Sequence, residues 1–255
     1  MTPLNLDVGA FHEHGYVVFP DLLGPDFAAE LYAACDGLDK VVWNASRSTA
    51  NERILLQDPR FRRIFTDTPF IDRIAALVGD DLQLLDLQLL EFAPDAEHVG
   101  AVSTGTREWH TDITFFSDLP VAVNVGMYLT DMTPEKGPLR VIPGSHRWHR
   151  EPAGNEVTVP HPDEVVVEVP AGAAVAFDAQ LWHSGGRNAS GTPRRGLFAY
   201  CSHYWVKRMD EYYERQLPQE LLDADDPRLR QFFGLEAAAE SIHGAAYARG
   251  NPAFT

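Results

Sequence analysis

The chain contains 255 residues, of which 45% are hydrophobic and 23% are charged, a composition typical of folded globular proteins and unlike that of disordered chains. Its 37 acidic residues outnumber 21 basic residues, which gives a formal net charge of −16 at pH 7. This charge repels nucleic-acid phosphates and anionic lipid head groups, so we expect neither nucleic acid nor a membrane surface as a partner.

The first third of the chain predicts one short strand followed by helices. Tyr16–Phe19 is a run of β-branched and aromatic residues, which favours a strand. Phe27–Cys35 and Phe70–Val78 carry apolar residues at helical spacing, and Pro59–Ile64 predicts a further short helix. Gly79 predicts the end of the helix at 70–78, because glycine readily adopts the backbone conformations that terminate helices.

From residue 82 onward the pattern changes to short apolar or alternating runs separated by turn residues such as Pro134–Gly137 and Pro170–Gly172. These runs are Leu82–Phe92, Val121–Thr130, Leu139–Ile142, Val165–Val169, Ala173–Phe177 and Leu197–Tyr204. Many short strands at this spacing favour a β-sandwich or a jelly roll.

Two segments beside these runs have a different character. Ala93–Arg107 is poor in apolar residues, which predicts a long surface loop that covers a substrate as a lid. The segment from Met209 is acidic and helical in texture, and Pro218 and Pro227 mark predicted helix starts. No composition shift separates these parts, so we expect a single domain over 1–255, with a helical part at 1–80, a core at 81–206 and a helical segment at 207–255.

The two cysteines, Cys35 and Cys201, lie far apart and fit neither a zinc-finger spacing nor a disulfide framework. Two free thiols suit a reducing cytoplasm. The start of the chain lacks the basic and apolar stretches of a secretory signal, and no apolar run is long enough to span a bilayer. We therefore expect a cytoplasmic protein.

Three fragments combine residues that could form a metal site: Trp109–Asp112, Trp182–Ser184 and Pro193–Arg195. On a strand, residues two apart point to the same face, so His110 and Asp112 would present an imidazole and a carboxylate to one point. His183 from an opposing strand would complete a set of two histidines and one carboxylate. This set is the facial triad of non-haem Fe(II) oxygenases, which leaves coordination positions open for a cosubstrate and for dioxygen.

Arg194 follows the second histidine at the start of a predicted strand. A planar guanidinium at the mouth of a barrel suits a bidentate grip on a carboxylate. The adjacent Arg195 would point to the opposite face, so we expect only one of the two to serve the site.

The segment 129–146, which ends in Pro143–His146, closely resembles the phytanoyl-CoA dioxygenase family. So do His183–Asn188, the following Arg194, and the opening Phe11–Val18. These signatures occur in the family's order, and the resemblance extends from about Phe11 to Tyr204. In the family's Trp-His-Gln-Asp run, Thr111 replaces the glutamine, and its side chain is expected to face away from the metal.

The resemblance implies a mainly β fold with flanking α-helices, namely a double-stranded β-helix, or cupin-type jelly roll. It implies Fe(II) held by His110, Asp112 and His183, with 2-oxoglutarate and dioxygen as cosubstrates. The distal carboxylate of 2-oxoglutarate would bind Arg194, and Gln88 would be a polar contact to the cosubstrate. His146 of the family turn is interpreted as structural.

The resemblance does not identify the substrate, because the loop at 93–107 matches no relative. Trp109 and Phe116 lie near the first ligands in sequence and are candidate contacts to a small-molecule substrate. Related halogenases have a small residue where this chain has Asp112. We therefore predict hydroxylation or a related desaturation, cyclisation or epimerisation, and the composition favours bacterial secondary metabolism.

Two alternatives remain open at this stage. A cupin-type metalloenzyme could bind Zn(II), Mn(II) or Ni(II) with the same three residues and act as a hydrolase or isomerase without 2-oxoglutarate. Such a site would not need Arg194 at its mouth. A non-catalytic binding module predicts a broken triad, whereas this sequence retains all three residues.

Overall fold

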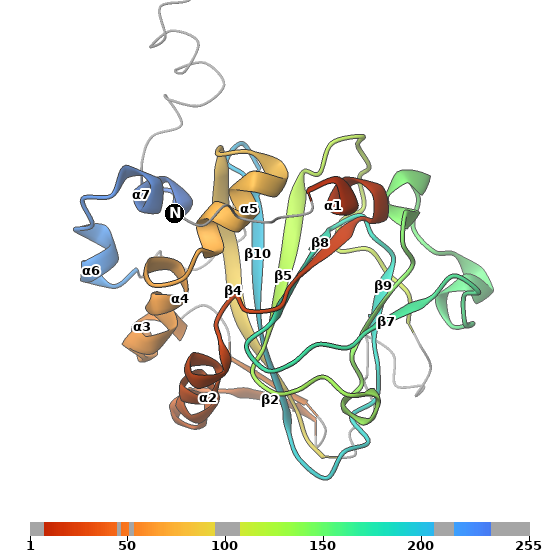
Figure 1. Ribbon diagram of the computed structural model, residues 1–255, viewed down its shortest axis with the longest axis horizontal. Helices are drawn as coiled ribbons and strands as arrows, with labels where there is room; N and C mark the ends of the chain where they lie inside the picture. The colour runs from red at the N-terminus through yellow and green to blue at the C-terminus, as the bar shows by residue number, and fades with distance from the viewer. Residues whose placement is uncertain (1–7, 45–46, 51–53, 95–107, 207–216, 236–255) are drawn as a thin grey trace, which may run out of the picture.

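A computed structural model describes residues 8–44, 47–50, 54–94, 108–206 and 217–235 (Figure 1). The helices of this part are α1 (Val8–His14), α2 (Pro25–Ala34), α3 (Ile54–Gln57), α4 (Arg63–Thr66), α5 (Phe70–Val78), α6 (Gln219–Leu222) and α7 (Pro227–Phe232). The strands are β1 (Tyr16–Phe19), β2 (Val41–Asn44), β3 (Arg47–Ala50), β4 (Leu82–Phe92), β5 (Ala122–Tyr128), β6 (Leu139–Val141), β7 (Val165–Val167), β8 (Ala174–Asp178), β9 (His183–Gly185) and β10 (Arg194–His203).

The strands form two antiparallel sheets, and these confirm the predicted jelly roll. The larger sheet has the order β1-β8-β5-β10-β4-β3-β2, and the smaller sheet has the order β7-β6-β9. Figure 1 shows the smaller sheet on one side of the larger sheet and helices α2, α3, α4, α6 and α7 on the other. The space between the sheets is therefore separate from the core beneath the helices.

Alternation along the strands determines which side chains enter each space. On β10, Leu197, Ala199 and Cys201 belong to the core beneath the helices, whereas Gly196 and Phe198 face the space between the sheets. Successive residues of a strand point to opposite faces, so one strand supplies an apolar core and a cavity wall together. Phenylalanine rings hold the helices of this core together. The ring centroid of Phe65 on α4 lies 5.1 to 5.4 Å from those of Phe70, Phe232 and Phe233. Phe65 therefore links α5, which contains Phe70, to α7, which contains Phe232.

Several predicted elements occur with the predicted bounds, including the strands Tyr16–Phe19 and Leu82–Phe92 and the helix Phe70–Val78. The predicted helix at 59–64 is instead a short 3-10 turn, Pro59–Arg62, that leads into α4. Helix α6 follows Pro218, and α7 begins at Pro227, as predicted. The sequence pattern did not predict α1 or the paired strands β2 and β3, which are each seven residues or shorter, whereas the strand expected at His183 is confirmed as β9.

Three other predictions concern the cysteines, membrane-spanning helices, and the segments at 93–107 and 207–255. Cys35 and Cys201 are buried free thiols, as expected. In the part of the chain that the structure describes, no helix is both long and apolar enough to cross a membrane. The predicted lid at 93–107 lies, except for its first two residues, outside the described residues, as do the first ten residues of the predicted C-terminal segment.

Candidate metal centre

A cavity of about 560 Å³ lies between the two sheets. One wall consists of inward-facing residues of the larger sheet, which are Gln88, Leu90, Phe92, Asn124, Tyr128, Phe177, Arg194, Gly196 and Phe198. The remaining lining includes Leu139 and Ser184 of the smaller sheet and Met132 between β5 and β6. This volume suits a small organic molecule, because ligand cavities in proteins commonly have about 300–1,000 Å³.

The structure brings His110, Asp112 and His183 together at this cavity. Each offers one ligand atom, and these atoms all lie within 4.8 Å of one another. Within the described residues, they are the one cluster of three such side chains that could hold a metal ion. The neighbouring His110 and Asp112 therefore converge on one point with His183, which is far from them in the sequence.

Backbone hydrogen bonds, not a regular strand, create this convergence. The amide and carbonyl of His110 exchange hydrogen bonds of 3.1 and 3.0 Å with those of His183 on β9. The amide of Asp112 donates to the carbonyl of Ala179 at 2.8 Å. The prediction that His110 and Asp112 share a strand is wrong, because His110 forms an isolated bridge and Asp112 lies outside the strands.

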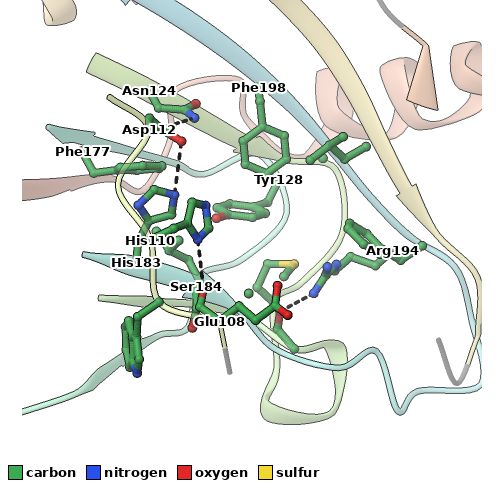
Figure 2. A pocket seen from close by; sticks show the side chains of 18 of the residues that line it. Glu108, His110, Asp112, Asn124, Tyr128, Phe177, His183, Ser184, Arg194 and Phe198 are labelled. Atoms are coloured by element: carbon green, nitrogen blue, oxygen red, sulfur yellow. Dashed lines mark hydrogen bonds and ion pairs between the residues drawn. The ribbon is translucent and has the colours of Figure 1, made fainter. Parts of the chain in front are cut away.

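Each histidine is oriented by a hydrogen bond from its other ring nitrogen. His183 Nδ1 lies 2.9 Å from the carbonyl oxygen of Leu181, and His110 Nδ1 lies 3.0 Å from that of Glu108 (Figure 2). A carbonyl oxygen can only accept, so each Nδ1 carries the proton. With Nδ1 engaged in this way, each ring is oriented so that Nε2 is the nitrogen available to a metal, as second-sphere hydrogen bonds commonly arrange for metal-binding histidines.

The carboxylate of Asp112 is oriented in a similar way. Asn124 Nδ2 on β5 donates to Asp112 Oδ2 at 3.1 Å, while Asp112 Oδ1 lies 3.5 Å from His183 Nε2. One carboxylate oxygen is thus held by the amide and the other is presented to the metal position. Asn124 was not among the predicted site residues, although a polar residue within the apolar run 121–130 is a signal that could have indicated it.

The electrostatics of the cluster also suit a metal. His183 is 6% exposed, and burial lowers its pKa to about 4, with the neighbouring His110 acting in the same direction. The imidazole is therefore neutral at pH 7 and available as a ligand. Two imidazole nitrogens and one carboxylate oxygen fit a divalent transition metal such as Fe(II) and leave coordination positions open.

The side chains of the adjacent Arg194 and Arg195 point to opposite faces of β10. Arg194 lines the cavity, and its guanidinium lies 4.0 Å above the ring of Phe92. Its Nη1 donates to the carbonyl oxygens of Lys136 and Gly186 at 3.0 Å each, and also to that of Gly137. These contacts fix the plane of a buried guanidinium in the cavity wall.

Arg195 is directed away from the cavity. Its guanidinium forms ion pairs of 2.5 Å with Glu91 and with Asp36, and it lies over the ring of Tyr32. These partners belong to β4, to the turn after α2 and to α2 itself. Arg195 therefore links the helices to the sheet, and its side chain does not line the cavity.

The other candidate residues differ in their placement. Gln88 and Trp109 both line the cavity. Trp109 is also a core residue, because it is 2% exposed, packs with Ile142 and Trp182 and donates its indole N–H to the Val159 carbonyl at 3.0 Å. Phe116 is not among the residues that line this cavity.

His146 occupies a buried structural position. Its Nε2 lies 3.2 Å from the carbonyl oxygen of His12. A Cβ added at Gly15, whose φ is +83°, would lie 2.5 Å from His146 Nδ1, so this imidazole packs directly against the glycine backbone. The histidine of the family turn thus joins the turn to the start of the chain.

Replacing Asn124 with leucine is expected to weaken metal binding by about tenfold or more, because removing a group that orients a ligand commonly has that effect. The Oδ1 atom of Asn124 is buried without a hydrogen-bond partner in the structure, so an apolar side chain of similar size should preserve the fold. Titration with Co(II), followed by its visible spectrum, measures the affinity. An unchanged affinity in a variant with an unchanged Tm would contradict this orienting role.

Comparisons with known proteins agree with this geometry. The model of a family described as phytanoyl-CoA dioxygenase matches residues 11–196. A dioxygenase of Aspergillus fumigatus, named af480, is 28% identical in an alignment 261 residues long. The alignment covers 94% of this chain and 81% of the relative.

Two solved structures share the fold. HygX from Streptomyces hygroscopicus, with nickel, 2-oxoglutarate and hygromycin B bound, has a TM-score of 0.66 and 18% identity over 79% of this chain and 88% of HygX. The non-haem alpha-ketoglutarate-dependent carbocyclase SnoK from nogalamycin biosynthesis has a TM-score of 0.65 and 21% identity over 84% and 92%.

Proposed function

Because the chain belongs to the phytanoyl-CoA dioxygenase family, we propose that His110, Asp112 and His183 hold Fe(II) and that Arg194 binds 2-oxoglutarate. The protein is a non-haem Fe(II)/2-oxoglutarate-dependent dioxygenase. The observation that carries the assignment of residues is their joint placement. Three ligand atoms lie within 4.8 Å of one another in a cavity whose wall also contains a buried arginine.

Bound Fe(II) supplies the activation of dioxygen, coupled to oxidative decarboxylation of 2-oxoglutarate, for oxidation of a substrate C–H bond. The residues of the chain orient the reactants and exclude water. Arg194 presents a rigid guanidinium to the distal carboxylate of 2-oxoglutarate. Leu90, Phe92 and Phe198 give the cavity apolar walls, which strengthens this ion pair by lowering the local dielectric constant.

The substrate is a small molecule, and its oxidation is proposed to be hydroxylation or a related desaturation, cyclisation or epimerisation. With Asp112 as a ligand, the metal would lack the position that a halide takes in related halogenases, which have a small residue there. A role in bacterial secondary metabolism is supported by the hygromycin B bound to HygX and by the nogalamycin pathway of SnoK. A hydrolase or isomerase without 2-oxoglutarate would have no use for the buried Arg194.

An anaerobic titration tests the cofactor pair. Adding Fe(II) and then 2-oxoglutarate to metal-free protein is expected to produce a weak visible charge-transfer band that requires both components. Succinate, which lacks the 2-oxo acid group, is the matched control and should produce no band. Absence of the band together with tight Zn(II) binding would overturn the oxygenase assignment and favour a hydrolase or isomerase.

A further inference from the structure

Glu108 is a carboxylate in the cavity wall to which the proposed function gives no role. It lies two residues before His110 and lines the cavity. Figure 2 shows its side chain extending along the cavity toward Arg194. Among the described lining residues, Asp112 is the other carboxylate, and it belongs to the metal centre.

The backbone around Glu108 is anchored on both of its faces. Its carbonyl oxygen accepts the hydrogen bond from His110 Nδ1 at 3.0 Å. The next residue, Trp109, is buried, and its amide donates to the carbonyl of Val157 at 2.9 Å. The Glu108 backbone is therefore held beside the metal centre, and its side chain extends from there toward Arg194 (Figure 2).

When Fe(II) and 2-oxoglutarate occupy the cavity, its charges do not sum to zero without a further cation. Fe(II), the carboxylate of Asp112, the dianion 2-oxoglutarate and the guanidinium of Arg194 together are neutral. Glu108 then adds one uncompensated negative charge, since Arg194 is the one permanent cation among the described lining residues. A carboxylate in a cavity that is lined mainly by apolar groups is stabilised by a nearby cation, so a cation is expected to join it when 2-oxoglutarate occupies Arg194.

We propose that Glu108 binds a cationic nitrogen of the substrate, such as a protonated amine. This inference rests on the proposed function, because it requires 2-oxoglutarate to occupy Arg194. The Glu108 side chain extends toward the guanidinium (Figure 2). The distal carboxylate of 2-oxoglutarate takes over that guanidinium and leaves Glu108 for the substrate. The substrate class is therefore a small, largely apolar molecule that carries an amine.

Binding of three matched probes tests the charge preference without turnover. The protein is loaded with Ni(II) and 2-oxoglutarate and titrated calorimetrically with 1-adamantylamine, 1-adamantanol and adamantane-1-carboxylate. The protonated amine is expected to bind about tenfold more tightly than the alcohol, because hydrogen bonds to charged groups are stronger than neutral ones. The carboxylate should bind most weakly. In Glu108→Gln, the preference for the amine should disappear.

A second measurement uses the cosubstrate alone. Glu108→Gln is expected to bind 2-oxoglutarate several-fold more tightly than the natural protein, because a competing negative charge near Arg194 is removed. Asp225→Asn is the matched control, since it removes one negative charge at an exposed position between α6 and α7. This control should change neither the probe preference nor the affinity for 2-oxoglutarate.

The outcomes separate this inference from the function on which it rests. If the Fe(II)/2-oxoglutarate band forms but the amine is not preferred over the alcohol, the role of Glu108 is wrong and the oxygenase assignment stands. A preference that persists in Glu108→Gln would overturn it equally. If none of the three probes binds, the 2-oxoglutarate affinities decide, and an unchanged or weaker affinity in Glu108→Gln contradicts the proposal. If the band itself is absent, both proposals fail.

Discussion

Replacing His183 with alanine is expected to weaken Fe(II) binding more than about a hundredfold and to abolish 2-oxoglutarate turnover. Loss of a residue that merely orients a ligand costs about 10–100-fold in affinity, and loss of the ligand itself should cost more. The Nε2 atom of His183 lies in the cluster of ligand atoms within 4.8 Å of one another, and the imidazole is buried and neutral at pH 7. Among the described residues no other candidate metal cluster occurs, so the variant offers the metal no second site of this kind.

Two assays measure this effect independently. Anaerobic titration gives the Fe(II) affinity, and succinate formation gives the turnover of 2-oxoglutarate. His14→Ala is the matched control, because it removes an exposed imidazole at the end of α1 and should alter neither quantity. Turnover retained in His183→Ala would refute the assignment of the triad.

Replacing Arg194 with alanine is expected to raise the KM for 2-oxoglutarate by at least about thirtyfold, which corresponds to the ~2 kcal/mol lower limit for truncating a buried charge pair. The guanidinium is 7% exposed and lies against Phe92, so water compensates poorly for its loss. Arg194→Lys keeps the charge but loses the planar fork. It should therefore recover only part of the affinity.

The neighbouring arginine provides a matched control. Arg195 is equally buried, yet its ion pairs go to Glu91 and Asp36 outside the cavity. Arg195→Ala should therefore lower the Tm and leave the KM for 2-oxoglutarate unchanged. A large rise in KM for Arg195→Ala, with little change for Arg194→Ala, would show that the other arginine serves the site.

The sequence alone determined the fold class and much of the architecture. The long run Leu82–Phe92 predicts β4 with its observed bounds, because apolar residues continue along a strand that is covered on both faces. Alternation also predicts that Arg194 and Arg195 lie on opposite faces, since successive side chains of a strand point in opposite directions. The family motifs around residues 129–146 and 183–194 identified the oxygenase class.

Short elements and distant contacts required the tertiary structure. Strand β9 spans only His183–Gly185, and it pairs with β6 from another part of the chain. A segment of this length carries no readable periodicity, so its pairing partner is what defines it as a strand. The contact between His110 and His183 is likewise an isolated bridge between distant segments. The local sequence around His110 therefore could not predict it.

The tertiary structure also determines which polar residues lie beside the metal centre. Asn124 contacts Asp112 because β5 lies next to β8 in the larger sheet. Glu108 lies at the cavity because its carbonyl is bonded to His110 and the following Trp109 amide is bonded to Val157. Local pattern predicts the face of a strand on which a side chain lies. Which residues it meets there depends on strand order and register, which are set by packing between segments far apart in the sequence.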